Sequence, residues 1–225
     1  MKKKYLIAVL ILSMVVAGGV AGCKSAGSTA GSTSSTSSST QSAAVTAAAS
    51  TTVTAADITY DDDDTNETWS EEDATTISLS GSLAEIDGDG ASEADGIITI
   101  NDAGAYVISG TLSDGQLVID AGSDDVVHLI LNGASITSSD GAAINAQQSG
   151  KLVITLADGT ENKITDGSTY SELDDSNEPD AAIFSKDDIT INGFGSLTVK
   201  GNYKNGIHSK DGLKIVNGTI TVDAA

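Results

Sequence analysis

Two short segments near the end of the chain carry the side chains best suited to binding chemistry. Lys186-Asp187 follows the run Ile-Phe-Ser, and Lys210-Asp211 follows Ile-His-Ser 24 positions later. If the segments stack one repeat apart, Asp187 and Asp211 lie roughly 4.8 Å apart, the spacing of neighbouring strands. Such a pair suits a calcium ion, which takes about six to eight oxygen ligands, and Lys186 and Lys210 suit a ligand carboxylate. The alternative is two solvated surface ion pairs that contribute little.

The turn before the second segment is a candidate sugar contact. Tyr203 and Lys204 lie there between Asn202 and Asn205. An exposed tyrosine ring can stack on the face of a sugar, and amides can hydrogen-bond its hydroxyl groups. Because asparagine also favours turns for conformational reasons, turn chemistry explains Asn202 and Asn205 equally well.

An acidic segment at 166–180 is the second calcium candidate. Asp174, Asp175 and Asp180 lie within it and could chelate one ion together. The segment falls between two groups of predicted strands. We therefore expect a loop that projects from a rigid scaffold, where binding residues often lie.

A repeating scaffold must position these residues. From residue 97 onward, short alternating runs of apolar and polar residues are separated by Gly, Asn and Asp, which is typical of half-buried strands. The runs form sets of three: 116–119, 128–133 and 134–137; 142–146, 152–156 and 162–165; 181–185, 188–193 and 196–200; 206–209, 213–218 and 219–223. The last two sets align at offsets of 23 to 25 residues. This period predicts an all-β fold, a parallel β-helix with three strands and about 24 residues per coil.

Asn-Gly pairs mark the predicted corners between the strands. Asn-Gly pairs occur at 132–133, 192–193 and 217–218, and we expect them at equivalent corners. Asparagine tolerates the left-handed conformation of a sharp corner, so we assign that conformation to the asparagine residues.

The composition restricts the partners. The chain has 32 acidic residues against 11 lysines, has no arginine, and carries a formal net charge of −21. Nucleic acid is excluded as a partner because phosphate binding needs a basic surface. The same charge repels an acidic glycan, so binding of such a glycan requires lysine contacts or a bridging calcium ion. The single cysteine excludes an internal disulfide.

The N-terminal residues resemble a targeting signal. Residues 1–22 have the basic, apolar and small-residue order of a secretory signal. The junction Val20-Ala21-Gly22-Cys23 resembles the bacterial lipobox, which implies that Cys23 is lipidated and anchors the protein to a membrane at the bacterial cell surface. An uncleaved membrane anchor is the alternative.

Two further segments precede the domain. Residues 23–56 consist almost entirely of Ser, Thr, Ala and Gly and are expected to form a flexible tether. Residues 57–74 form an acidic leader, with nine acids in the 17 positions 57–73. We expect it to be solvated, with weak calcium chelation as the alternative. Trp69 within it is predicted to pack onto the first strands.

Several motifs in the domain, at 75–225, resemble a known family. They are Gly104-Ala105-Tyr106-Val107-Ile108-Ser109-Gly110-Thr111-Leu112, Leu131-Asn132-Gly133-Ala134-Ser135-Ile136, Gly159-Thr160-Glu161-Asn162, Ala182-Ile183-Phe184-Ser185-Lys186-Asp187-Asp188 and Gly206-Ile207-His208-Ser209-Lys210-Asp211. In this order they resemble bacterial surface lipoproteins with a carbohydrate-binding domain. The resemblance implies a right-handed parallel β-helix similar to that of pectate-lyase-type polysaccharide lyases, calcium binding, and affinity for polygalacturonate and cellulose. The sequence stops in mid-repeat, where the family continues, so we expect a fragment whose missing coils complete the helix.

We expect a non-catalytic protein that binds acidic polysaccharide, with calcium as a bridge. A calcium-dependent polysaccharide lyase is one alternative, with Lys186 or Lys210 as the base that removes a proton next to the uronate carboxyl group. A calcium-stabilised structural or adhesive stalk is the other. His208 takes the place of Phe184 in the next repeat and is predicted to be a partly buried spacer, and His128 points outward from a strand. Neither histidine pairs with a recognisable Ser or Cys nucleophile.

Overall fold

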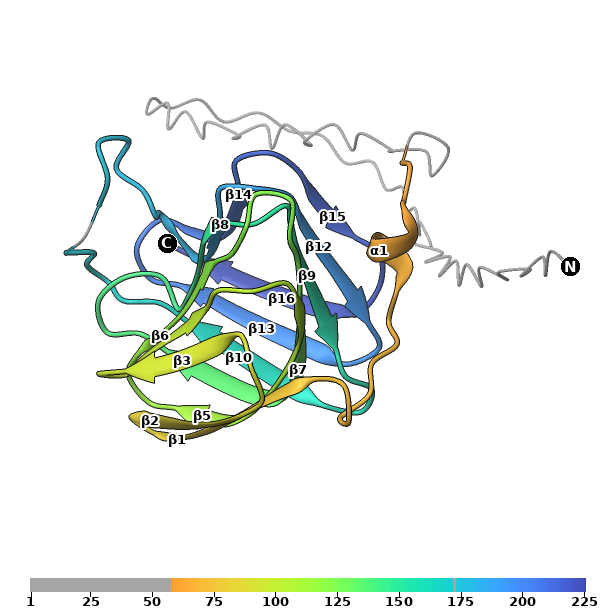
Figure 1. Cartoon of the computed structure of the whole chain (residues 1–225). Helices are drawn as coiled ribbons and strands as arrows, with labels where there is room; N and C mark the ends of the chain where they lie inside the picture. The colour runs from red at the N-terminus through yellow and green to blue at the C-terminus, as the bar shows by residue number, and fades with distance from the viewer. Residues whose placement is uncertain (1–57, 172) are drawn as a thin grey trace, which may run out of the picture. The chain divides into compact units, whose positions relative to one another are not determined.

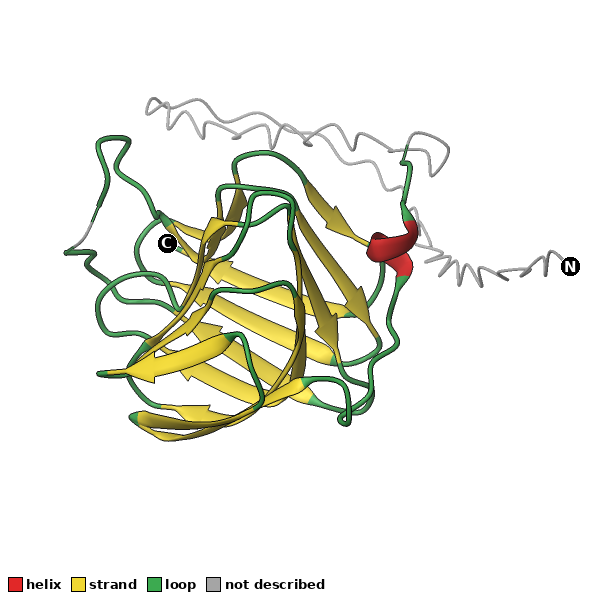
Figure 2. Cartoon of the chain, in the orientation of Figure 1, coloured by secondary structure: helices red, strands yellow, loops and turns green. Residues whose placement is uncertain are grey.

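The computed structural model describes residues 58–171 and 173–225. The predicted signal peptide at 1–22, Cys23 and the tether at 23–56 lie outside the described residues. The described part is built from strands, apart from the single helical turn α1 at Asp62–Thr65 (Figure 2). It contains no helix with the length and apolar character that a membrane crossing needs.

Two antiparallel hairpins begin the domain, and parallel strands follow (Figure 1). The first hairpin pairs β1 (Thr75–Gly81) with β2 (Leu83–Asp87), and the second pairs β3 (Ala91–Ala94) with β4 (Ile97–Ile100). The later strands are β5 (Gly104–Leu112), β6 (Gln116–Asp120), β7 (Val126–Thr137), β8 (Ile144–Gln148), β9 (Lys151–Leu156), β10 (Glu161–Thr165), β11 (Ala181–Ser185), β12 (Ile189–Gly193), β13 (Ser196–Gly201), β14 (Asn205–Ser209), β15 (Leu213–Ile215) and β16 (Thr219–Ala224).

The parallel strands wind into stacked coils with three faces. The first face is the six-stranded sheet β14-β11-β8-β6-β4-β3. The ten-stranded sheet supplies the other two. The second face contains β9, β12 and β15, which extend from the first half of β7, and the third face contains β10, β13 and β16, which extend from its second half. The sequence predicted two strands at 128–133 and 134–137. That division is wrong, since β7 runs through both without a break.

The predicted repeat register is confirmed. Ile183 pairs with Ile207, Ile189 with Leu213, and Leu197 with Ile220. These are the offsets that the sequence predicted. Parallel coils with this register form a β-helix-type fold, and the right-handedness of the coil stays a prediction.

The core consists of aliphatic ladders inside the coils. On the first face one ladder runs through Ile98, Leu117, Ile144, Ile183 and Ile207 in successive strands. The first four side chains are fully buried, and Ile207 in the last coil is partly buried. Each buried side chain contributes about 1.5–3 kcal/mol, and the stacking makes every coil depend on its neighbours.

Glycine, rather than asparagine, adopts the left-handed conformation at the predicted corners. The φ angles of Gly133, Gly193 and Gly218 are +76°, +94° and +100°. The only described residues other than glycine with positive φ are Asp95 and Asn177. The assignment of that conformation to the asparagine residues is therefore wrong, because glycine adopts it without a steric cost from a Cβ atom.

The acidic leader is not simply solvated. Asp61 caps α1, and its carboxylate and that of Asp64 accept each other's backbone N–H. The side chain of Asp64 is 0% exposed, because α1 packs against the outer side of β12. It accepts hydrogen bonds from Lys151 Nζ at 3.1 Å, Lys214 Nζ at 2.6 Å and Thr190 Oγ1 at 2.5 Å. The expectation of a solvated leader is therefore wrong at this residue.

Trp69 follows α1 and packs as predicted. Its ring contacts a cluster on the outer side of the second face that includes Val107 of β5 and Ile130 of β7. The leader is thus a strap along the second face, fixed by an ionic contact at α1 and an apolar contact at Trp69.

Candidate functional site

A groove lies along the outer side of the first face. It measures about 550 Å³ and is walled on one side by the insertion at 166–180. The turns that follow β5 and β7 also line it, and the turn after β7 is hydrogen-bonded to the insertion. Strands β6, β8 and β11 form the floor. The lining residues are Ile97, Asp114, Gly115, Gln116, Ser138, Ser139, Asp140, Gly141, Asn145, Gln147, Ser171, Leu173, Asp174, Glu178, Pro179, Phe184 and Lys186.

Buried contacts hold the insertion against the coils. Asp166 is nearly fully buried and accepts hydrogen bonds from the hydroxyl of Tyr170 at 2.7 Å and from the backbone N–H of Asn202 at 2.5 Å. Burial, together with the bond to Asp166, raises the pKa of Tyr170, so its hydroxyl stays a donor at neutral pH. The rings of Tyr170 and Tyr203 stack with centroids 4.4 Å apart.

These contacts define the roles of the predicted sugar-binding turn. Asn202 also donates its side-chain amide to the carbonyl of Asp166 at 2.8 Å, so its polar groups are used within the protein. One face of the Tyr203 ring is covered by Tyr170, and the ammonium of Lys204 lies 4.9 Å from the ring centroid of Tyr203. The turn thus supports the insertion, and neither Tyr203 nor Lys204 lines the groove.

The two predicted lysines both face the insertion. Lys186 Nζ lies 3.7 Å from a carboxylate oxygen of Asp174, and Lys210 Nζ lies 2.8 Å from one of Glu178. The hydrogen bond that Lys210 donates to Glu178 raises the pKa of Lys210, which keeps this amine protonated. Of the two, Lys186 lines the groove.

Asp187 and Asp211 occupy equivalent turns in successive coils. The N–H of Asp187 donates to Ser185 Oγ, and the N–H of Asp211 donates to Ser209 Oγ. Asp187 also accepts the N–H of Ser149 at 2.9 Å. The register of β11 and β14 places the two residues one coil apart, and the stacking of their carboxylates stays a prediction.

The other predicted acids are not brought together as a chelating set. Asp174 accepts the backbone N–H groups of Ser176 and Glu178, which lower its pKa. Asp180 instead meets the imidazole of His208, at 2.5 Å. No three or more His, Cys, Asp or Glu side chains in 58–171 and 173–225 are arranged to hold a metal ion. Asp187 and Asp211 alone supply few of the about six to eight oxygens that calcium needs.

The floor of the groove contains an amide without a protein partner. Asn145 is 7% exposed and lies between Val118 and Phe184 in the register of the first face. Its backbone belongs to β8, but its side chain makes no hydrogen bond to any described residue, while Gln147 lies near it in the lining. The amide atoms of Asn145 are not among the fully buried polar atoms of the described residues that lack a partner. They are therefore open to the groove, where a ligand with hydroxyl groups can bond to them.

Comparisons with known proteins decide the family. A family described as "Carbohydrate-binding domain-containing protein" matches residues 94–225. The chain belongs to this carbohydrate-binding domain family. A relative with the same description, from Acetivibrio thermocellus, is 44% identical over 138 residues, which are 60% of this chain and 48% of the relative. The chain thus spans about half the length of that relative.

A solved structure supports the fold of the carbohydrate-binding domain. It is titled a polysaccharide lyase-like protein from C. thermocellum, a gadolinium derivative. It matches with a TM-score of 0.64 and 40% identity over 67% of this chain and 62% of the other. Together with the parallel coils, this likeness places the domain among β-helix-type folds.

The groove of this carbohydrate-binding domain includes residues that the sequence analysis missed. Asn145, Gln147 and Gln116 follow the same alternation as any outward polar side chain, and nothing in the sequence distinguishes them. They line a groove only because the insertion folds back over their face. Lys186 and Asp174 were identified, but as parts of different candidate sites.

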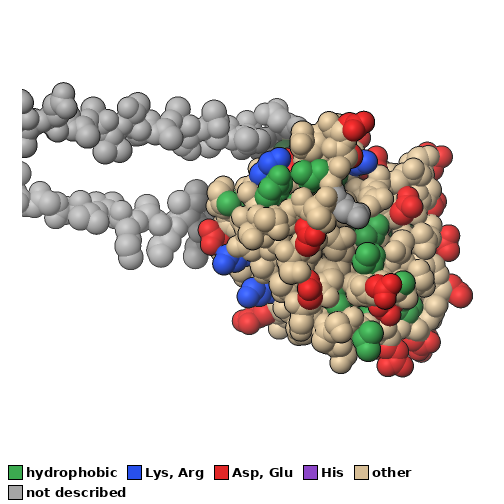
Figure 3. Space-filling model, turned by 90° about the vertical axis from the view of Figure 1, so that its left-hand side faces the viewer, with side chains coloured by type: hydrophobic (Ala, Val, Ile, Leu, Met, Phe, Trp, Pro, Cys, Tyr) green, Lys and Arg blue, Asp and Glu red, His purple; other side chains and the backbone are tan. Residues whose placement is uncertain are grey.

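The face that carries the insertion is strongly acidic. Figure 3 shows Asp and Glu side chains spread over it, with few lysines in the upper and left parts of the view. In the groove itself, Asp114, Asp140, Asp174 and Glu178 accompany the single lysine Lys186. Such a groove does not attract an acidic glycan by charge alone.

Proposed function

We propose that the protein is a non-catalytic, surface-anchored module that binds polysaccharide in the groove beside the insertion. The amide of Asn145, which lines the groove and makes no side-chain hydrogen bond to a described residue, carries this proposal. A sugar hydroxyl can both donate to and accept from such an amide. The exposed amide of Gln147 extends the same surface along the floor.

Acidic polysaccharide such as polygalacturonate is the proposed ligand when calcium is present, and cellulose is a neutral alternative. The groove is acidic, so a uronate chain needs a cation between it and the protein. The carboxylates of Asp187 and Asp211 lie next to Lys186 and Lys210 in sequence and can supply part of a calcium shell. Uronate carboxylates and water would complete that shell, which makes calcium a shared ion.

Lysine chemistry argues against a lyase. A lyase base must be unprotonated to remove the proton next to the uronate carboxyl group. The hydrogen bond that Lys210 donates to Glu178 raises the pKa of Lys210 and keeps this amine charged. Lys186 Nζ lies 3.7 Å from a carboxylate oxygen of Asp174.

The proposed location follows from residues 1–56. The lipobox-like junction at Cys23 supports a lipid anchor at the bacterial cell surface, and the Ser- and Thr-rich segment after it supports a tether. Mass spectrometry of the protein purified from its native membrane tests this part separately, because lipidated Cys23 would be the first residue of the mature chain.

Affinity electrophoresis tests the function. We expect gels with polygalacturonate to retard the protein with calcium but not with chelator, with no unsaturated product. Asn145→Ala should weaken binding about fivefold to tenfold without changing thermal unfolding, because its side chain makes no hydrogen bond to the described residues. Lys186→Ala should weaken binding of polygalacturonate, whereas Lys163→Ala, an exposed lysine on β10, should not.

Three results would contradict the proposal. Unsaturated product would make the protein a lyase. Equal retardation of Asn145→Ala and the unchanged protein would exclude the groove as the polysaccharide-binding site. Stabilisation by calcium without retardation in any glycan would favour a stalk.

A further inference from the structure

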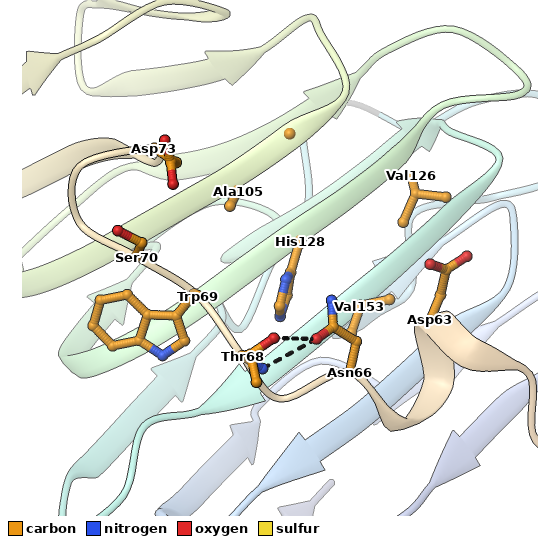
Figure 4. A pocket seen from close by; sticks show the side chains of 11 residues that line it. Asp63, Asn66, Thr68, Trp69, Ser70, Asp73, Ala105, Val126, His128 and Val153 are labelled. Carbon is orange, nitrogen blue, oxygen red and sulfur yellow. Dashed lines mark hydrogen bonds between the residues drawn. The ribbon is translucent and has the colours of Figure 1, made fainter. Parts of the chain in front are cut away.

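A second hollow lies on a different face of the domain, beneath the leader strap. It measures about 520 Å³ and lies between the leader residues after α1 and the outer side of β5, β7 and β9. Figure 4 shows Trp69, Ser70 and Asp73 of the leader on one side and His128 and Val153 of the strands below. The leader half of the hollow lies outside the family match, which begins at residue 94.

A chain of hydrogen bonds fixes the state of His128. Asn192 Nδ2 donates to the carbonyl oxygens of Asp64 and Asn66, so Asn192 Oδ1 points the other way, toward Thr155. The Thr155 hydroxyl donates its one hydrogen to this Oδ1. Thr155 Oγ1, 2.6 Å from His128 Nε2, must therefore accept from Nε2–H.

The second nitrogen of the ring is then a hydrogen-bond acceptor. Burial lowers the pKa of His128 despite the opposing effect of Asp63, so the ring is neutral at pH 7. A neutral imidazole that carries its hydrogen on Nε2 has a lone pair on Nδ1. No described residue donates a hydrogen bond to that nitrogen.

The hollow also contains two carboxylates, which are acceptors. The carboxylates of Asp63 and Asp73 make no hydrogen bond or ion pair with any described side chain, and no lysine lines the hollow. Figure 4 places Asp73 and Asp63 on opposite sides of His128. The carboxylates therefore do not converge on one point, as a single bound cation would require, but surround an elongated space.

The geometry points to a second carbohydrate site at this hollow, which takes a neutral sugar ring. The ring's hydroxyl groups donate to Asp63, Asp73 and His128 Nδ1, and its apolar face packs on the half-buried indole of Trp69. Uronates are excluded, because the hollow has two carboxylates and no cation to balance a third. This site is independent of the groove beside the insertion, and neither needs the other.

The fluorescence of Trp69 provides a direct test, since Trp69 is the only tryptophan in the chain. We expect cellotetraose to change the tryptophan emission of the full chain and to saturate it below about 10 mM. Tetragalacturonate should leave it unchanged. His128→Phe and Asp73→Ala should each weaken the effect about fivefold; Asp73 is exposed, so the second variant keeps the test valid if the first does not fold.

The two sites can fail separately. Asn145→Ala, which alters only the groove, should leave the cellotetraose titration of Trp69 unchanged. Absence of any emission change up to about 10 mM cellotetraose would overturn the second site. A change produced by ethylammonium chloride but not by cellotetraose would overturn it too, and would assign the hollow to a cationic side chain of a protein partner.

Discussion

Asp64 shows how much one residue of the leader contributes. Its carboxylate is fully buried and binds Lys151, Lys214 and Thr190, which belong to three successive coils, while Asp61 caps its turn. A buried carboxylate is stabilising only when all its partners are present. The leader therefore ties β9, β12 and β15 together through this one side chain.

Replacing this residue should destabilise the domain. We expect Asp64→Ala to lower the free energy of unfolding by about 3 kcal/mol, because it leaves the nearly buried Lys151 with one partner fewer. The matched control is Asp62→Ala in the same turn, which is exposed and should cost less than about 0.5 kcal/mol. Urea unfolding monitored by circular dichroism measures both. Equal effects of the two changes would mean that the strap adds nothing to stability.

The same carboxylate makes a pH-dependent contribution. Burial alone would raise the pKa of Asp64. Hydrogen bonds from Lys214, Thr190 and the backbone of Asp61 lower it by more than burial raises it, so the pKa lies below its ordinary value in the folded state. The stabilisation is then complete above about pH 4, the pKa of the unfolded chain, and is lost as the pH falls through the lower folded pKa.

A comparison with Asp64→Asn tests this sign. The difference in unfolding free energy between the unchanged protein and Asp64→Asn should be constant from pH 7 to about pH 4 and should shrink below it. Urea unfolding across this range measures it. A difference that already shrinks between pH 7 and pH 5 would show that another group titrates.

At the scale of elements, the corners of the coils decide how tightly the strands stack. A Cβ atom on Gly193 would lie 2.3 Å from the carbonyl oxygen of Leu156 in the neighbouring coil. At Gly133, which also has positive φ, a Cβ atom would meet nothing within 4 Å. The two glycines thus separate the cost of backbone conformation from the cost of a clash.

Alanine at these two corners should have different effects. Gly133→Ala should cost about 1 kcal/mol, the ordinary penalty of a left-handed residue with a side chain. Gly193→Ala should cost about 3 kcal/mol or more, because the coils must also move apart. Thermal unfolding of both variants measures the difference. Equal costs would mean that the stack relaxes freely around the new methyl group.

The insertion is the element that turns an ordinary sheet face into a groove. It is fixed through Asp166, Tyr170 and the ion pairs of Lys186 and Lys210. Without it, Asn145 and Gln147 would be outward polar residues in contact with water. The groove therefore exists only because the insertion at 166–180 lies against the outer side of the first face.

For the whole molecule, the net charge of −21 determines how an acidic glycan responds to salt. Without calcium, the protein and a galacturonate oligomer repel each other, and salt screens this repulsion. Residual binding in chelator, which is too weak to retard the protein in a gel, should therefore become weaker still when the salt concentration is lowered from about 150 mM to about 10 mM. Isothermal titration with tetragalacturonate measures this. Cellotetraose, which is uncharged, is the control and should show no change, and tighter binding of the acidic oligomer at low salt would contradict the argument.

The sequence by itself determined the scaffold. Alternation and a period near 24 residues predicted parallel coils, and the pairing of Ile183 with Ile207 and of Leu197 with Ile220 confirmed the register. This works because each coil has to bury its inward face on its neighbours, so the pattern repeats in the chain. The packing of Trp69 was also predictable, since a large apolar ring in an acidic segment needs a surface to cover it.

Only the tertiary structure decided the sites. The burial of Asp64, the unsatisfied amide of Asn145 and the acceptor state of His128 each depend on residues more than 25 positions away in the chain. No local pattern records such contacts, because an outward Asn in a strand looks the same whether water or a loop covers it. The sequence therefore specifies which side chains face outward, and the folding of the insertion and the leader over those faces decides which of them can bind a ligand.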